Sequence, residues 1–195
     1  MTEIFDDDDA ATPLTSGEKQ GLIPTHIALR SELNEWEQRG VLAAEQWAFG
    51  RRHKTILDQL FLRKLHSQMF KDIWRWAGDY RKTERNIGVD ASHIEIELKK
   101  LLDDTHYWIE NKTYPPDEIA IRFHHRLVWI HPFPNGNGRH ARLIADLLIK
   151  SLGKLRFSWG QTSLVSISEA RKHYVNALRA ADNHNIEPLL LFARS

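Results

Sequence analysis

The sequence predicts an all-α protein: one mainly helical domain of roughly seven to nine helices, with a small β-hairpin. Two observations support this prediction. Apolar residues recur three or four positions apart along most of the 195-residue chain, and residues that start or stop helices bound these stretches. Residues 80–89, by contrast, are rich in charges and lack the helical spacing, so we expect them to form a small exposed hairpin.

The N-terminal half begins with two predicted helices. The first runs from Thr25 to about Arg39, with Gly40 as its stop, and the second begins near Leu42. The other helices are expected at 55–70, from 92, from 115 to 130, at 138–152, from 166 and after 188. The helix over 115–130 must end there, because Pro132 disfavours a helical conformation at the residue before it.

Three regions are expected along the chain. Residues 1–17 contain four consecutive aspartates and no apolar period, which indicates a mobile acidic tail. Residues 18–40 form an N-terminal segment that carries the first helix. Residues 41–195 form the main domain.

Composition excludes several classes of protein. The 27 basic residues nearly balance the 26 acidic ones, so the net charge of +1 gives no overall attraction to DNA. The chain has no cysteine, which excludes disulfides and thiolate metal sites. No apolar run approaches the roughly 18 residues of a membrane span, and the acidic start is unlike a signal peptide. We therefore expect a cytoplasmic protein with no membrane partner.

The densest chemical signal is the segment HPFPNGNGRHAR at 131–142, between two apolar helices. Its glycines let backbone amides approach an anion closely, and the next helix points its positive dipole end at the same place. Arg139 and Arg142 lie one helical turn apart and can reach phosphates held there. His131 stands at the end of the preceding helix, where it can take a proton near neutral pH. The pattern predicts a phosphate site with a general base.

This segment resembles the motif of the Fic family, which reads HPF, any residue, Asp or Glu, GNGR, any two residues and Arg. The resemblance extends upstream to WRWAGDYR at 74–81 and downstream to the helix around Tyr174. It is closest to the bacterial group labelled mobile mystery protein B, carried near mobile elements. It implies the mainly helical Fic fold, a catalytic domain over 41–195 and a flap at the predicted hairpin; a role in a toxin–antitoxin pair stays open.

The resemblance also implies an activity, protein adenylyltransferase. Such an enzyme transfers AMP from ATP to a Ser, Thr or Tyr hydroxyl of a target protein, with Mg²⁺. His131 would deprotonate the hydroxyl. The phosphates would be held by the amides of Gly136, Asn137 and Gly138 and by the side chains of Arg139 and Arg142. Target docking would use the flap residues Tyr80, Arg81, Ile87 and Gly88.

One position departs from the motif. Asn135 stands where most of the family places the carboxylate that ligates magnesium, and an amide oxygen brings no negative charge. Asn135 is therefore expected to be a weak ligand. Two alternatives follow: a donor of UMP or of a phosphoryl group in place of ATP, or a catalytically silent Fic-fold binding module.

Fic proteins are often restrained by a helix bearing Ser or Thr, three residues, Glu and then Gly or Asn. Ser31 and Glu35 fit the first part of this pattern, and Trp36 departs from it. We expect Glu35 to pair with Arg142 and so to inhibit the enzyme. The sequence leaves open whether the chains form a homo-oligomer.

The histidines leave two other functions to consider, a zinc site and a metal-dependent nuclease. His124, His125, His131 and His140 could form a zinc site, but adjacent histidines on a helix point in different directions and no HExxH spacing exists. A nuclease could use His131, Asn135 and His140 around a metal, but the balanced charge disfavours it.

Overall fold

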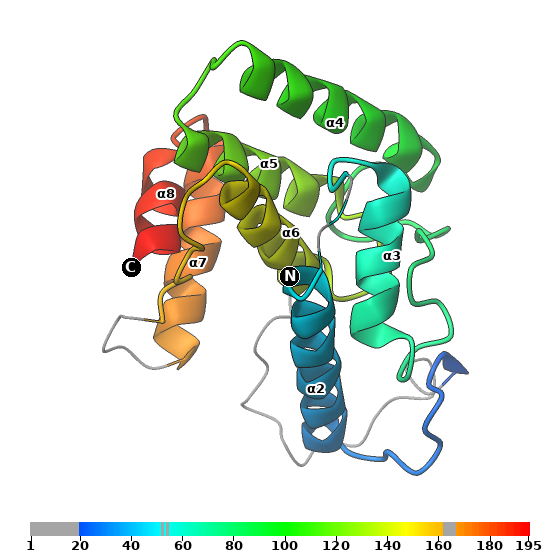
Figure 1. The fold of residues 1–195 in the computed structure, drawn as a ribbon. Helices are drawn as coiled ribbons and strands as arrows, with labels where there is room; N and C mark the ends of the chain where they lie inside the picture. The colour runs from blue at the N-terminus through cyan, green and yellow to red at the C-terminus, as the bar shows by residue number, and fades with distance from the viewer. Residues whose placement is uncertain (1–19, 52, 54, 162–166) are drawn as a thin grey trace.

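A computed structural model describes residues 20–51, 53, 55–161 and 167–195. Within these residues it contains seven α-helices and one short 3-10 helix, which confirms the all-α class. Figure 1 shows α6 near the centre of the molecule, with its neighbours arranged around it. The helices are α2 (Arg30–Phe49), α3 (Gln59–Phe70), the 3-10 helix η1 (Ala91–His93), α4 (Ile94–Glu110), α5 (Pro116–Ile130), α6 (Asn137–Ser151), α7 (Ile167–Asp182) and α8 (Glu187–Arg194). The predicted acidic tail and the predicted start of α7 at residue 166 lie outside the described residues.

Helix α2 corrects one prediction. It runs without interruption through Gly40, so that residue is not a helix stop and the helix crosses the expected boundary after residue 40. A Cβ on Gly40 would lie 2.2 Å from the carbonyl oxygen of Met69 on α3. Gly40 therefore serves close packing between α2 and α3, since no other residue lets the two backbones approach so closely.

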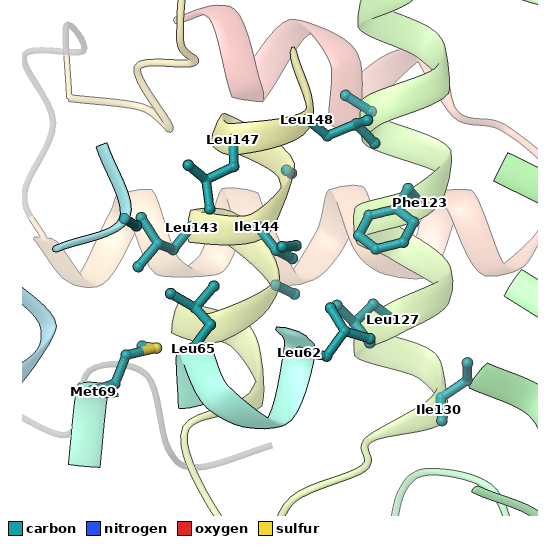
Figure 2. Packing of buried hydrophobic residues seen from close by; sticks show 14 of the residues in the cluster. Leu62, Leu65, Met69, Phe123, Leu127, Ile130, Leu143, Ile144, Leu147 and Leu148 are labelled. Atoms are coloured by element: carbon teal, nitrogen blue, oxygen red, sulfur yellow. The ribbon is translucent and has the colours of Figure 1, made fainter. Parts of the chain in front are cut away.

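The core forms where α3, α5 and α6 meet. Figure 2 shows leucines and other apolar side chains of these three helices packed together, among them Leu62, Phe123 and Ile144. Almost the whole circumference of α6 is buried, from Asn137 to Ile149. A helix that is buried on all sides is held by its neighbours, so both of its ends are fixed in place.

Helices α4 and α5 follow the sequence pattern. The predicted core face of α4, which includes Ile94, Leu98 and Leu101, is buried. Helix α5 begins with Pro116 in its first turn and ends at Ile130, as Pro132 requires. These two helices carry the chain to the 131–138 loop.

The predicted β-hairpin at 80–89 is not found, because this segment contains no strand; an isolated bridge pairs Leu22 with Trp74 elsewhere in the described residues. The buried Arg81 side chain supplies the reason. Its guanidinium donates hydrogen bonds to the carbonyl oxygens of Thr83 (3.1 Å), His131 (2.7 Å) and Val89. Because one side chain takes up these carbonyls, the segment is held as an irregular loop.

In the described part of the chain, no helix combines the length and the apolar character that a membrane crossing requires.

Candidate active site

The loop between α5 and α6 is turned by two residues with left-handed backbones. His131 has φ 55° and ψ 59°, and Gly136 has φ 78° and ψ 7°. Glycine is required at 136 for a second reason, because a Cβ there would lie 2.5 Å from the Phe70 ring. The loop therefore lies directly on α3.

Two further contacts fix the shape of the loop. The Asn137 side chain accepts a hydrogen bond from the amide of Phe133 (2.9 Å) and donates one to the carbonyl of the same residue (2.8 Å). Phe133 itself is fully buried. The expected phosphate-binding role of Asn137 can involve only its backbone amide, because its side chain closes the loop.

A cavity of about 270 Å³ opens beside this loop. Its walls come from three parts of the chain that are distant in sequence: the flap loop with Arg85, Asn86 and Ile87; the segment from His131 to Gly138; and the α7 face with Arg171, Tyr174 and Leu178. The structure thus brings together His131, Gly136, Asn137 and Gly138, as the sequence predicts.

The start of α6 makes the cavity suited to an anion. The first hydrogen bond of this helix is donated by His140 to the Gly136 carbonyl (3.0 Å), so the amides of Asn137, Gly138 and Arg139 precede the helical ladder. Arg85 and Arg171 add positive charge to the lining, and none of its described residues carries a carboxylate. Phosphate groups fit this combination of amides, helix dipole and guanidinium groups.

His131 is poised as a base. Its pKa is lowered from 6.5 to about 4, first because the ring is partly removed from water and then because the Arg81 guanidinium lies near. The imidazole is therefore neutral at pH 7. Its Nδ1 is buried, which leaves Nε2 as the atom that can face the cavity.

Neither Arg139 nor Arg142 belongs to the residues that line the cavity. Arg139 is turned toward α2, where its Nη2 lies 2.7 Å from Oε2 of the buried Glu37. Arg142 lies over the ring of Tyr174, 5.8 Å from its centre. In this conformation the predicted phosphate roles of the two arginines are not realised.

The expected inhibitory pair is not brought together. The Glu35 carboxylate is 69% exposed and lies 3.6 Å from Arg39 on the same helix, and Ser31 is half-buried one turn earlier. The carboxylate that reaches the motif is Glu37, which also accepts a hydrogen bond from Trp74 Nε1 (2.7 Å). The sequence carries a signal for it, because Glu37 falls on the same helical stripe as Leu33 and Ala44, and a charge on an apolar stripe needs a partner.

The four predicted docking residues divide into two kinds. Arg81 is 3% exposed and holds backbone carbonyls, and the half-buried Tyr80 packs against Phe133 with ring centres 5.5 Å apart. The side chains of both therefore shape the site from within. Ile87 lines the cavity, and Gly88 is exposed with φ +99°. A Cβ on Gly88 would lie 2.7 Å from His131 Cβ, so this glycine lets the flap approach the base.

The donor set does not fit a magnesium ion held by the protein. The described residues contain no group of three or more His, Asp or Glu placed to hold a metal. Oδ1 of Asn135 is buried without a hydrogen-bond partner, and Asn135 is not among the lining residues. Of the other histidines weighed for zinc, His124 contacts Tyr174, His125 contacts Asp182 and His140 contacts the Leu62 carbonyl.

Comparison with known families supplies the classification, because residues 56–149 match the Fic/DOC family. These residues form a Fic domain. The match includes α3, the flap loop, α5 and the loop before α6, and so contains every wall of the cavity except α7. The mobile mystery protein B group stays a prediction.

Relatives of the Fic domain include named enzymes. The protein adenylyltransferase Fic of Nematostella vectensis is 29% identical over 119 residues, which are 60% of this chain and 26% of that protein. The chain thus spans about a quarter of the length of the curated relatives it matches.

Solved structures share the fold. The N-terminal Fic domain of a VirB-translocated Bep effector from Bartonella quintana, solved with bound ADP, has a TM-score of 0.69 at 20% identity, over 87% of this chain and 86% of that one. BepC from Bartonella tribocorum, solved with bound AMPPNP, has a TM-score of 0.65 at 20% identity, over 92% and 97%. Identity this low shows a common fold alone.

Proposed function

We propose that the Fic domain is a protein adenylyltransferase that transfers AMP from ATP to a hydroxyl side chain of a target protein. The observation that carries the proposal is the neutral His131 imidazole, which shares one cavity with the amides that open α6. A relative named as an adenylyltransferase and two neighbours solved with adenine nucleotides support it.

The reaction follows from this arrangement. Nε2 of His131 accepts the proton of the incoming hydroxyl, whose oxygen attacks the α-phosphorus of ATP. The bond between the α-phosphorus and the oxygen that bridges to the β-phosphate breaks, and pyrophosphate leaves. The amides of Asn137 and Gly138 stabilise the charge that develops on the phosphate oxygens.

A magnesium ion would bind together with the donor, ATP. No carboxylate of the described residues lines the cavity, so phosphate oxygens and water would supply the ligands that this ion prefers. Proton transfer and phosphate binding are carried out by residues of the chain itself.

We further propose that α2 restrains the enzyme through Glu37 and not through Glu35. Arg139 is held in a buried ion pair with Glu37, and a guanidinium held there is unavailable to phosphates. Release of this pair would let Arg139 turn toward the donor, as the Fic motif implies.

Intact-mass spectrometry tests the function. Candidate target proteins, and the chain itself, are incubated with ATP, UTP or GTP and magnesium. We expect a mass increase equal to one AMP with ATP, and none with the His131→Ala variant. An increase equal to UMP would identify UTP as the donor, and an increase equal to a phosphoryl group would identify the transferred group as phosphoryl. No increase with any nucleotide would contradict an enzymatic function.

A further inference from the structure

One buried side chain outside the motif contacts the backbone of the two segments that lead into different walls of the cavity. His66 lies on α3 and is completely buried. Its Nδ1 accepts a hydrogen bond from the Gly78 amide (2.9 Å), and its Nε2 lies 3.0 Å from the Asn135 carbonyl oxygen. Its ring stacks on Phe133, with ring centres 3.8 Å apart and planes at 14°.

These two partners determine the state of the ring. The Gly78 amide can only donate, so Nδ1 carries no proton, and the Asn135 carbonyl can only accept, so Nε2 carries one. A doubly protonated ring would lose the bond to Gly78. Burial, and then the neighbouring His140, lower the pKa of His66 well below 6.5, which agrees with a permanently neutral ring.

The two partners belong to different walls. Asn135 lies in the loop before α6, and Gly78 is the residue from which the chain enters the flap loop that carries Arg81 and Arg85. A second contact joins the same two segments, because the Arg81 amide donates a hydrogen bond to the Pro132 carbonyl (2.9 Å). Residues 78–81 are thus fixed to the motif loop at both ends.

We infer that His66 is a positioning residue that fixes the motif loop and the flap entry relative to each other, and so sets the spacing of the nucleotide cavity. The inference rests on the proposed function for the identity of the ligand. Its structural content, a single ring that couples two backbone segments, stands without that function.

Two substitutions separate the two hydrogen bonds. An asparagine amide oxygen can take the place of Nδ1, so His66→Asn keeps an acceptor for Gly78 and loses the donor to Asn135. A glutamine amide nitrogen reaches the position of Nε2, so His66→Gln keeps that donor and loses the acceptor. A purely structural role would be disturbed by both in the same way.

Thr105 supplies a control away from the cavity. It is also completely buried, and its hydroxyl donates a hydrogen bond to a backbone carbonyl, that of Leu101 on α4 (2.7 Å). Thr105→Val therefore removes one buried bond to a backbone carbonyl, as His66→Asn does, but the carbonyl belongs to a helix and not to the motif loop.

Amide hydrogen exchange and ATP binding test the inference. We expect His66→Asn to speed exchange of the Phe133 amide by about tenfold, while the Gly78 amide stays protected. The same variant should weaken ATP binding by about tenfold. His66→Gln should speed exchange at Gly78 by a similar factor and keep Phe133 protected. Thr105→Val should change exchange at Phe133 and Gly78, and ATP affinity, by no more than about twofold.

Equal exchange rates in His66→Asn and Thr105→Val, or no faster exchange at Phe133 and Gly78 in the two His66 variants, would overturn the inference. Failure of the wild-type chain to bind ATP would instead contradict the proposed function, because the exchange pattern needs no nucleotide.

Discussion

The two ends of α6 differ in whether their buried polar groups have hydrogen-bond partners. At the C-terminal half, the buried Asp146 accepts hydrogen bonds from the Phe157 amide (3.2 Å) and from Trp159 Nε1 (3.1 Å), and Arg156 lies 3.4 Å away. At the N-terminal end and in the loop before it, buried polar atoms of His131, Asn135, Arg139 and His140 have no hydrogen-bond partner within the described residues.

This difference indicates which end serves a ligand. Buried polar atoms without partners destabilise a fold, so they persist where a function requires them. The fifth such atom, Nδ1 of His124, belongs to a ring whose Nε2 contacts the cavity residue Tyr174. The polar network around Asp146 contributes to stability, and the cavity end is arranged for chemistry.

The largest expected effect is at the cavity end. His131→Ala should lower the transfer rate by about a thousandfold, the scale of general base catalysis. ATP affinity should change by less than about threefold, because the imidazole moves a proton and does not hold the phosphates. Single-turnover rates and calorimetric titration measure the two quantities separately. A large loss of affinity with unchanged turnover would assign His131 to binding.

The opposite end should show the reverse pattern. Asp146→Ala leaves the Trp159 and Phe157 donors buried without partners, so it should lower the free energy of unfolding by about 3 kcal/mol. Turnover below the melting temperature should stay within about twofold of wild type. Urea unfolding and transfer assays check both parts, and a strong loss of turnover in folded protein would remove the distinction between the two ends.

Acid should destabilise the cavity end through its buried histidines. Burial, as the largest cause, lowers the pKa of His66 well below 6.5, that of His124 to about 3 and that of His140 to about 4. Between pH 6.5 and these values the unfolded chain binds protons that the folded chain does not. Stability is therefore full above pH 6.5 and is lost as the pH falls.

The expected loss is about 1 kcal/mol for each of His124 and His140 between pH 6.5 and pH 5.5, and His66 acts in the same direction. Urea unfolding across this range measures it. His124→Gln should reduce the slope of the free energy of unfolding against pH. A free energy of unfolding that does not change with pH would show that the rings are protonated in the folded protein.

The smallest expected effect concerns restraint. Glu37→Gln keeps the acceptor for Trp74 and removes the charge that holds Arg139, so transfer should rise by about tenfold, or about 1.4 kcal/mol of barrier. Glu35→Gln, on the same helix, should change nothing. In an Arg139→Ala background Glu37→Gln should lose its effect, because the two side chains act as a unit. A fall in activity with Glu37→Gln would make the pair a structural anchor.

Much of the fold follows from local pattern. The buried stripes of α4 and α5 and the end of α5 before Pro132 are visible in the sequence, because they depend on neighbouring residues. The passage of α2 through Gly40 is not, because it depends on Met69, which is distant in sequence. The hairpin prediction failed for the same reason: the buried Arg81 guanidinium reaches carbonyls on both sides of the loop.

The candidate site shows the same division. The motif places His131 and the glycines correctly, because they are contiguous. It cannot show that Arg139 faces Glu37, that His66 bonds Asn135, or that Arg171 lines the cavity, because these contacts join residues that are distant in sequence.

The central claim, that a neutral His131 is the base for AMP transfer, is tested most directly by the pH dependence of the single-turnover rate. The rate of labelled AMP transfer is measured with ATP well below its KM, so that it reports the free enzyme, between pH 8 and pH 5, in the wild type and in Glu37→Gln. Because the pKa of His131 is lowered to about 4, the rate should stay level within about twofold over this range. A tenfold fall for each pH unit below 6.5 would show an ordinary, solvated imidazole, and the absence of transfer at every pH would contradict the claim.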